Sequence, residues 1–133
     1  MSSAKRFEDL EVWQRTKDLT NLIYRLSTSG DFSRDFGLRD QMRRASVSVM
    51  SNIAEGFESQ TQAMFIKYLA YTKSSAGEVR AQLYIAKDQA YINGQDFQEA
   101  FSSAEIWRCQ NCSPLPRVNT CELSPFVLCL FSC

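Results

Sequence analysis

Apolar residues recur along much of this chain at alternating steps of three and four, the spacing of one face of an α-helix. The first such segment runs from about Glu8 to Ser27. Turn-forming residues 28–33 separate it from a second segment that begins at Phe36 or Leu38 and ends at Glu55. We expect Gly56 to take a left-handed conformation and cap this second helix. The two apolar faces are Val12, Thr16, Leu19, Leu22, Ile23 and Leu26, then Met42, Ala45, Val49 and Ile53.

The third segment has the most regular pattern, a coiled-coil-like seam about thirty residues long. Its apolar positions are Phe65, Leu69, Thr72, Ala76, Val79, Leu83, Ala86 and Ala90. Ser59 or Thr61 is expected to cap its start, and Asn93-Gly94 is expected to end it. Asp96 would then cap a fourth helix. That helix carries Phe97, Phe101 and Ala104 on its apolar face.

Short connections between long helices favour antiparallel neighbours. The predicted fold is therefore all-α, an antiparallel up-down four-helix bundle with a shortened or aberrant fourth helix.

The composition changes at about Trp107. All five cysteines and all three prolines lie in residues 109–133, where Arg117 and Glu122 are the only charged residues. Pro114 prevents the fourth helix from continuing. We therefore divide the chain into a helical bundle domain, residues 1–108, and an aberrant Cys/Pro-rich apolar tail, residues 109–133. Our hypothesis is that a frameshift near residues 104–106 produced this tail.

The cysteine spacing is weak evidence for zinc. Cys109 and Cys112 are a short-spaced pair, but Cys129 and Cys133 have three residues between them and lie in an apolar run. We predict no metal site. The apolar end from Pro125 to Cys133 is instead expected to promote aggregation or to dock into the groove left by an incomplete fourth helix.

Charge and residue types disfavour catalysis. The 15 basic and 15 acidic residues balance, and histidine, the commonest general base and metal ligand, is absent. We predict no enzyme, no catalytic residues, no cofactor and no small-molecule substrate. No apolar run is long enough for a membrane span and the first residues lack a secretory signal, so we expect a cytoplasmic protein.

Two polar strips accompany the apolar seams on the second and third helices. Helical spacing places Ser48, Asn52 and Glu55 on one side of the second helix, and Ser75, Glu78 and Gln82 on one side of the third. Facing each other, the strips would pair their polar groups and fix the register of helices or subunits. We interpret them as an assembly or polar seam rather than a recognition surface.

Basic residues form a second candidate site, for phosphate groups. The candidates are Arg39, Arg43 and Arg44 on the second helix and Lys73, Arg80 and Lys87, which recur every seven residues, on the third. The alternative is an ordinary solvated face, because Asp40, Glu78 and Asp88 lie among these charges. Trp13, Tyr68, Tyr71, Tyr84 and Tyr91 could stack on bases, but packing or a subunit interface is favoured for them.

Several stretches resemble a known family. They are Phe7-Glu8-Asp9-Leu10-Glu11-Val12-Trp13-Gln14, Gln41-Met42-Arg43-Arg44-Ala45-Ser46-Val47-Ser48, Ser51-Asn52-Ile53-Ala54-Glu55-Gly56-Phe57 and Tyr84-Ile85-Ala86-Lys87-Asp88. Over residues 7–105 the chain resembles the four-helix bundle proteins of 23S ribosomal RNA intervening sequences, a family related to accessory proteins of diversity-generating retroelements. This resemblance implies a homo-oligomer, with a pentamer as the expected ring, and RNA or a reverse transcriptase as partner. Met50 replaces a proline that many relatives have there, which should leave the second helix straighter.

The predicted function is thus a non-enzymatic, self-assembling, RNA-associated accessory protein. The alternative is a purely structural oligomeric scaffold, or a degenerate mobile-element remnant, without nucleic-acid binding.

Overall fold

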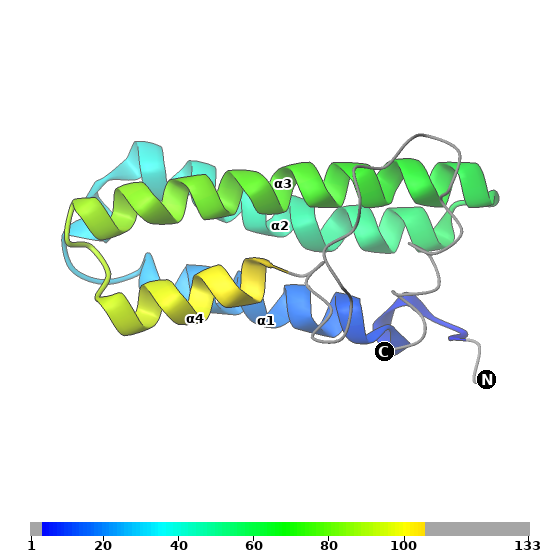
Figure 1. Cartoon of the computed structure of the whole chain (residues 1–133), viewed down its shortest axis with the longest axis horizontal. Helices are drawn as coiled ribbons and strands as arrows, with labels where there is room; N and C mark the ends of the chain where they lie inside the picture. Colours follow the sequence, from blue (N-terminus) through cyan, green and yellow to red (C-terminus); the bar gives the residue numbers. More distant parts are fainter. Residues whose placement is uncertain (1–3, 106–133) are drawn as a thin grey trace, which may run out of the picture.

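The computed structural model of the protein describes residues 4–105, and over this range it contains four α-helices (Figure 1). They are α1 (Glu11–Leu26), α2 (Phe36–Glu58), α3 (Gln62–Asp88) and α4 (Gly94–Ala104), with 3-10 turns η1 (Phe7–Asp9) before α1 and η2 (Asp31–Arg34) before α2. No strand occurs within the described range, so the all-helical prediction is confirmed. The tail at 109–133 lies outside these residues, and so does residue 106 of the proposed frameshift region, 104–106.

Contacts between helices define the bundle. Thr20 Oγ1 on α1 donates to the Ser46 carbonyl on α2 at 3.0 Å, and Arg43 Nε donates to Ser27 Oγ at 2.8 Å. Residue numbers thus rise along α1 as they fall along α2, so these helices are antiparallel. In Figure 1, α3 and α4 lie in front, with α2 behind α3 and α1 behind α4.

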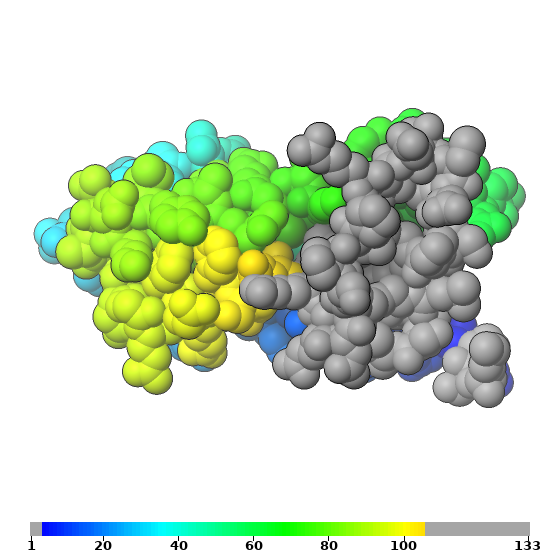
Figure 2. Space-filling model, in the orientation of Figure 1, coloured from blue at the N-terminus to red at the C-terminus, as the bar shows by residue number. Residues whose placement is uncertain are grey.

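The apolar seams meet in one core along the bundle. Leu19, Ile23, Met42, Val49, Val79 and Leu83 are completely buried, and Phe97, Ala100 and Ala104 of α4 complete the core. The predicted seam of α3 is buried from Leu69 to Ala86. The prediction that Ala90 is the last seam position was wrong, because α3 ends at Asp88 and Ala90 is exposed with a positive φ of 59°. In the space-filling view, side chains of α3 and α4 form a continuous surface along the C-terminal half of α3 (Figure 2).

Gly56 does not end α2. The predicted left-handed cap is wrong, because α2 continues to Glu58 and Gly30 is the one glycine among residues 4–105 with a positive φ. Gly56 is buried, and a Cβ added to it would lie 2.8 Å from both Phe65 Cδ2 and Tyr68 Cβ on α3. The missing side chain lets α2 and α3 approach closely.

The caps of the last two helices were partly predicted. Thr61 Oγ1 accepts from the Met64 backbone N–H at 3.3 Å and caps α3, one of the two expected choices. Asn93, not Asp96, caps α4, since Asn93 Oδ1 accepts from the Asp96 backbone N–H at 2.7 Å. Asp96 thus lies in the first turn, where its charge still favours the helix dipole.

Within residues 4–105, none of the helices combines the length and the apolar character needed to cross a membrane.

Tyr91 ties the connection between α3 and α4 to the start of α2. Its hydroxyl donates to Asp35 Oδ2 at 3.2 Å, while Asp35 Oδ1 caps α2 by accepting from the Leu38 N–H at 3.1 Å. The Tyr91 ring stacks on Phe32 with centroids 5.3 Å apart. Burial, and then the bond to Asp35, raise the pKa of Tyr91 above its ordinary value.

This contact predicts a loss of stability in alkali. Because the folded state holds the phenol proton, the contribution is complete below about pH 10 and is lost as the pH rises through the raised, folded-state pKa. Tyr91→Phe should lower the urea midpoint at about pH 8, and its difference from the wild type should shrink as the pH passes 10. A difference that stays constant over this pH range would contradict the assignment.

Candidate nucleic-acid interface

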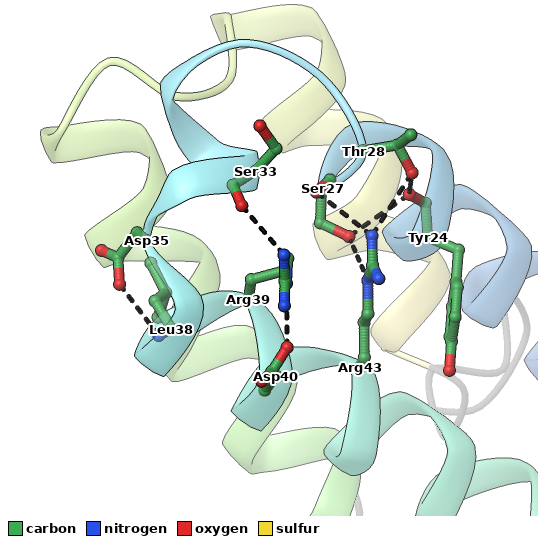
Figure 3. Close-up of polar contacts among 9 residues, drawn as sticks. All are labelled: Tyr24, Ser27, Thr28, Ser33, Asp35, Leu38, Arg39, Asp40 and Arg43. Carbon is green, nitrogen blue, oxygen red and sulfur yellow. Dashed lines mark hydrogen bonds and ion pairs between the residues drawn. The ribbon is translucent and has the colours of Figure 1, made fainter.

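Three arginines on α2 form a cluster at the corner where α1 connects to α2. The arginine cluster is Arg39, Arg43 and Arg44. Arg39 Nε donates to Asp40 Oδ1 at 2.8 Å, and Arg39 Nη1 donates to the Ser33 carbonyl at 2.9 Å (Figure 3). These two bonds hold the Arg39 guanidinium against η2.

Arg43 binds the end of α1. Its Nε donates to Ser27 Oγ at 2.8 Å, and its Nη2 donates to the Ser27 carbonyl at 3.2 Å and to Thr28 Oγ1 at 3.3 Å (Figure 3). The last carbonyl groups of a helix have no partner within it, and a cation there is favoured by the helix dipole. Arg43 therefore joins the C-terminal end of α1 to α2.

All three arginines of the cluster act on the carboxylate of Asp40. The hydrogen bond from Arg39 lowers the pKa of Asp40, and the charges of Arg39, Arg44 and Arg43 add to the effect. Three guanidinium groups thus share one neighbouring carboxylate, and Arg44 is exposed. With Arg34, Asp31 and Asp35 included, the corner holds four arginines and three aspartates, a surplus of one positive charge that the overall balance of the chain concealed.

The other three predicted cations lie elsewhere. Lys87 Nζ is 4.6 Å from the centre of the Phe97 ring on α4, whereas Arg43 contacts α1. Arg80 is half-buried, and its Nε is buried without a hydrogen-bond partner among the described residues. Lys73 is exposed on the same α3 row. The six candidates therefore form two separate surfaces, the arginine cluster beside α1 and the Lys73, Arg80 and Lys87 row ending beside α4.

The two polar strips meet where α2 and α3 pack. Ser48 Oγ lies 3.0 Å from Ser75 Oγ, and Asn52 Nδ2 donates to Ser48 Oγ at 3.2 Å. On α3, Gln82 Nε2 donates to Glu78 Oε1 at 3.1 Å. Glu55 and Glu78 are exposed. The strips thus contribute a hydrogen-bonded contact within the bundle, and their role in assembly stays a prediction.

Sequence reasoning missed two aromatic residues beside the arginine cluster. Tyr24 and Phe36 are 43% and 64% exposed. The Arg43 guanidinium carbon lies 4.8 Å from the Tyr24 ring centre, and that of Arg39 lies 4.7 Å from the Phe36 ring centre. The three-residue spacing of Phe36 and Arg39 could have revealed the second pair. The first pair joins different helices, so no local signal marks it.

Within residues 4–105, no three Asp or Glu side chains lie close enough together to hold a metal ion. All five cysteines lie outside the described residues.

Over residues 4–105 the protein is a small helical bundle with one apolar core and a cluster of arginines at the α1–α2 corner. Residues 8–108 match the 23S rRNA-intervening sequence protein family, and the chain belongs to that family. A solved structure of similar fold is a protein of unknown function from the S23 ribosomal protein family of Bacteroides thetaiotaomicron. It is 22% identical with a TM-score of 0.65, and the match covers 71% of this chain and 90% of that one. No curated protein matches the chain.

Proposed function

We propose that this protein is a non-enzymatic, self-assembling accessory protein of the cytoplasm that binds RNA through the arginine cluster on α2. The surplus of guanidinium charge around Asp40 carries the proposal. Arginine suits phosphate because its planar donors match two phosphate oxygens at once. Membership of a family named for ribosomal RNA intervening sequences supports RNA as the source of those phosphates.

The residue types available support a binding role rather than a reaction. The chain has no histidine, and the carboxylates nearest the arginine cluster already have partners, as Asp40 binds Arg39 and Asp35 binds the Leu38 N–H and the Tyr91 hydroxyl. A general base needs a free lone pair within reach of a substrate proton. The corner offers donors and positive charge instead.

The test is the salt dependence of RNA binding. We expect single-stranded RNA to bind the full chain, with an affinity that falls steeply between 50 and 200 mM salt. Arg44→Gln should reduce the slope of log K against log salt by about 0.7, since one phosphate contact is lost. Arg15→Gln, the same change at an exposed α1 position, should leave the slope unchanged. Lys73→Gln tests the α3 row in parallel.

Absence of binding at the lowest salt would reject the RNA role and favour the structural scaffold. An equal loss of slope in Arg44→Gln and Arg15→Gln would show that binding is spread over the whole surface.

Self-assembly is proposed to use the outward side of α3. The α3 stripe consists of Met64, Tyr71 and Ile85, which are 40%, 47% and 49% exposed. Tyr71 follows Met64 by seven residues and Ile85 follows Tyr71 by fourteen, so all three lie on one line along α3. The heptad position between Tyr71 and Ile85 is Glu78, whose carboxylate accepts a hydrogen bond from Gln82 Nε2. A row of large apolar side chains at heptad spacing is the pattern that a second helix covers.

Charge placed in the α3 stripe should prevent association. Ile85→Glu is expected to reduce the mass measured by light scattering to that of one chain, because burying an unpaired carboxylate costs more than the contact yields. Arg15→Glu, which reverses a charge at an exposed position of α1, should keep the wild-type mass. A wild type that is already monomeric, or an unchanged mass for Ile85→Glu, would reject this face.

A further inference from the structure

Tyr24 and Phe36 are the two exposed aromatic rings that stack on arginines of the cluster. Phe36, Arg39 and Arg43 follow each other at three- and four-residue steps on α2, so they lie along one side of that helix. Tyr24 on α1 continues the row beyond Arg43 (Figure 3). The row therefore runs aromatic, cation, cation, aromatic across the corner.

The arginines are fixed before any ligand arrives. Arg39 is bonded to Asp40 and to the Ser33 carbonyl, and Arg43 has three bonds to Ser27 and Thr28. Each guanidinium lies over one face of its ring, which orients that ring. A ring held in this way loses little freedom when a further flat group stacks on it.

The aromatic rings and guanidinium groups of the row fit a polymeric ligand in which planar groups alternate with anions. Of the acidic groups nearby, Asp31 pairs with Arg34 at 3.7 Å and Asp40 pairs with Arg39 at 2.8 Å. The third, Asp35, accepts from the Leu38 N–H and the Tyr91 hydroxyl. Arg44 is exposed beside them. Bases of single-stranded nucleic acid stack on aromatic rings, with arginine adding a cation–π contribution, while its phosphates bind the remaining cations. Bases in a duplex are already stacked on each other and offer no free face.

We infer that Tyr24 and Phe36 form a stacking platform for unpaired bases of single-stranded RNA at the α1–α2 corner. This inference rests on the proposed RNA-binding function. It adds that the protein prefers single-stranded to duplex RNA, and that Tyr24 and Phe36 cause this preference. Tyr84 supplies a matched contrast, because it is 51% exposed yet packs on Phe97 and Phe101 of α4 and has no arginine against its ring in the described structure.

The experiment measures fluorescence anisotropy of labelled oligouridine and of a duplex RNA of equal length with the full-length protein. Tyr24→Leu and Phe36→Leu keep the apolar bulk and every charge but remove the ring. Each should bind oligouridine on the order of tenfold more weakly, with the salt slope and the duplex affinity unchanged. Tyr24→Phe and Phe36→Tyr should bind as the wild type does, and Tyr84→Leu is the control.

The outcomes distinguish a failure of RNA binding from a failure of the stacking platform. If the wild type binds neither RNA, the proposed function fails. If the wild type binds and both leucine variants match Tyr84→Leu, the stacking platform is rejected while RNA binding stands. A leucine variant that loses affinity together with a change in mass by light scattering would make this corner a contact between copies, which also overturns the platform.

A second readout does not depend on the leucine variants folding. Phe36→Trp retains an aromatic ring, and its extra tryptophan emission, measured as the difference from the wild type, should be quenched when oligouridine binds. Emission that stays constant while anisotropy reports binding would place the bases away from residue 36.

Discussion

Replacing Gly56 with alanine is expected to destabilise the protein by about 2 kcal/mol and to lower its Tm by roughly 10 °C. The new Cβ would lie 2.8 Å from Tyr68 Cβ, an atom that moves only with the α3 backbone, and equally close to the Phe65 ring. α2 and α3 must therefore separate along the seam in which Val49, Ile53 and Leu69 are buried. The gain in helix propensity, roughly 1 kcal/mol, does not offset this separation.

The matched control is the same substitution at another glycine inside a helix. A Cβ at Gly77 on α3 would meet only Arg80 Nη2, at an ordinary contact distance of 3.8 Å. Gly77→Ala should therefore stabilise the protein by roughly 0.5–1 kcal/mol, since alanine restricts the unfolded chain more than glycine does. Urea unfolding of the two variants should give changes of opposite sign, and two changes of the same sign would contradict the close approach at Gly56.

Arg43→Met is expected to cost about 2 kcal/mol of stability, although it replaces a residue that is only half-buried. Three hydrogen bonds to Ser27 and Thr28 are lost, and the Ser27 carbonyl at the end of α1 loses a charged donor. Methionine keeps most of the apolar stem, so the loss reports the guanidinium rather than the packing.

Arg44→Met is the control for this second prediction. Arg44 is adjacent in sequence but exposed, and its removal should change stability by no more than about 0.5 kcal/mol. RNA affinity should instead fall in both variants, because each loses one cation of the cluster. Chemical unfolding curves separate the two roles, and equal stability losses would show that Arg43 is not a structural tie.

The sequence predicted the bundle well because its signal is repetitive. Apolar residues at three- and four-residue steps define the buried faces of all four helices, and Leu69 to Ala86 follow that pattern without a break. The errors occurred where one residue type serves two purposes. Gly56 sits at the apparent end of a pattern, as a capping glycine would, and the contact with Phe65 and Tyr68 that explains it comes from another helix.

The candidate site was predictable only in part for the same reason. Arg39, Arg43 and Arg44 are visible as a local cluster, and their spacing indicates neighbouring positions on α2. Their partners Ser27, Thr28 and Tyr24 belong to α1 and reach them through tertiary packing. Lys87 shows how regular spacing can mislead. The seven-residue spacing predicted a row of phosphate-binding cations that includes Lys87, but in the structure its ammonium lies over the Phe97 ring of α4.

The most direct measurement of the central claim is the mass of the full-length protein by light scattering during gel filtration, with and without single-stranded RNA. We expect an oligomer of several chains that carries the RNA with it at 50 mM salt and releases it at 200 mM. A single chain that elutes apart from the RNA at both salt concentrations would contradict it.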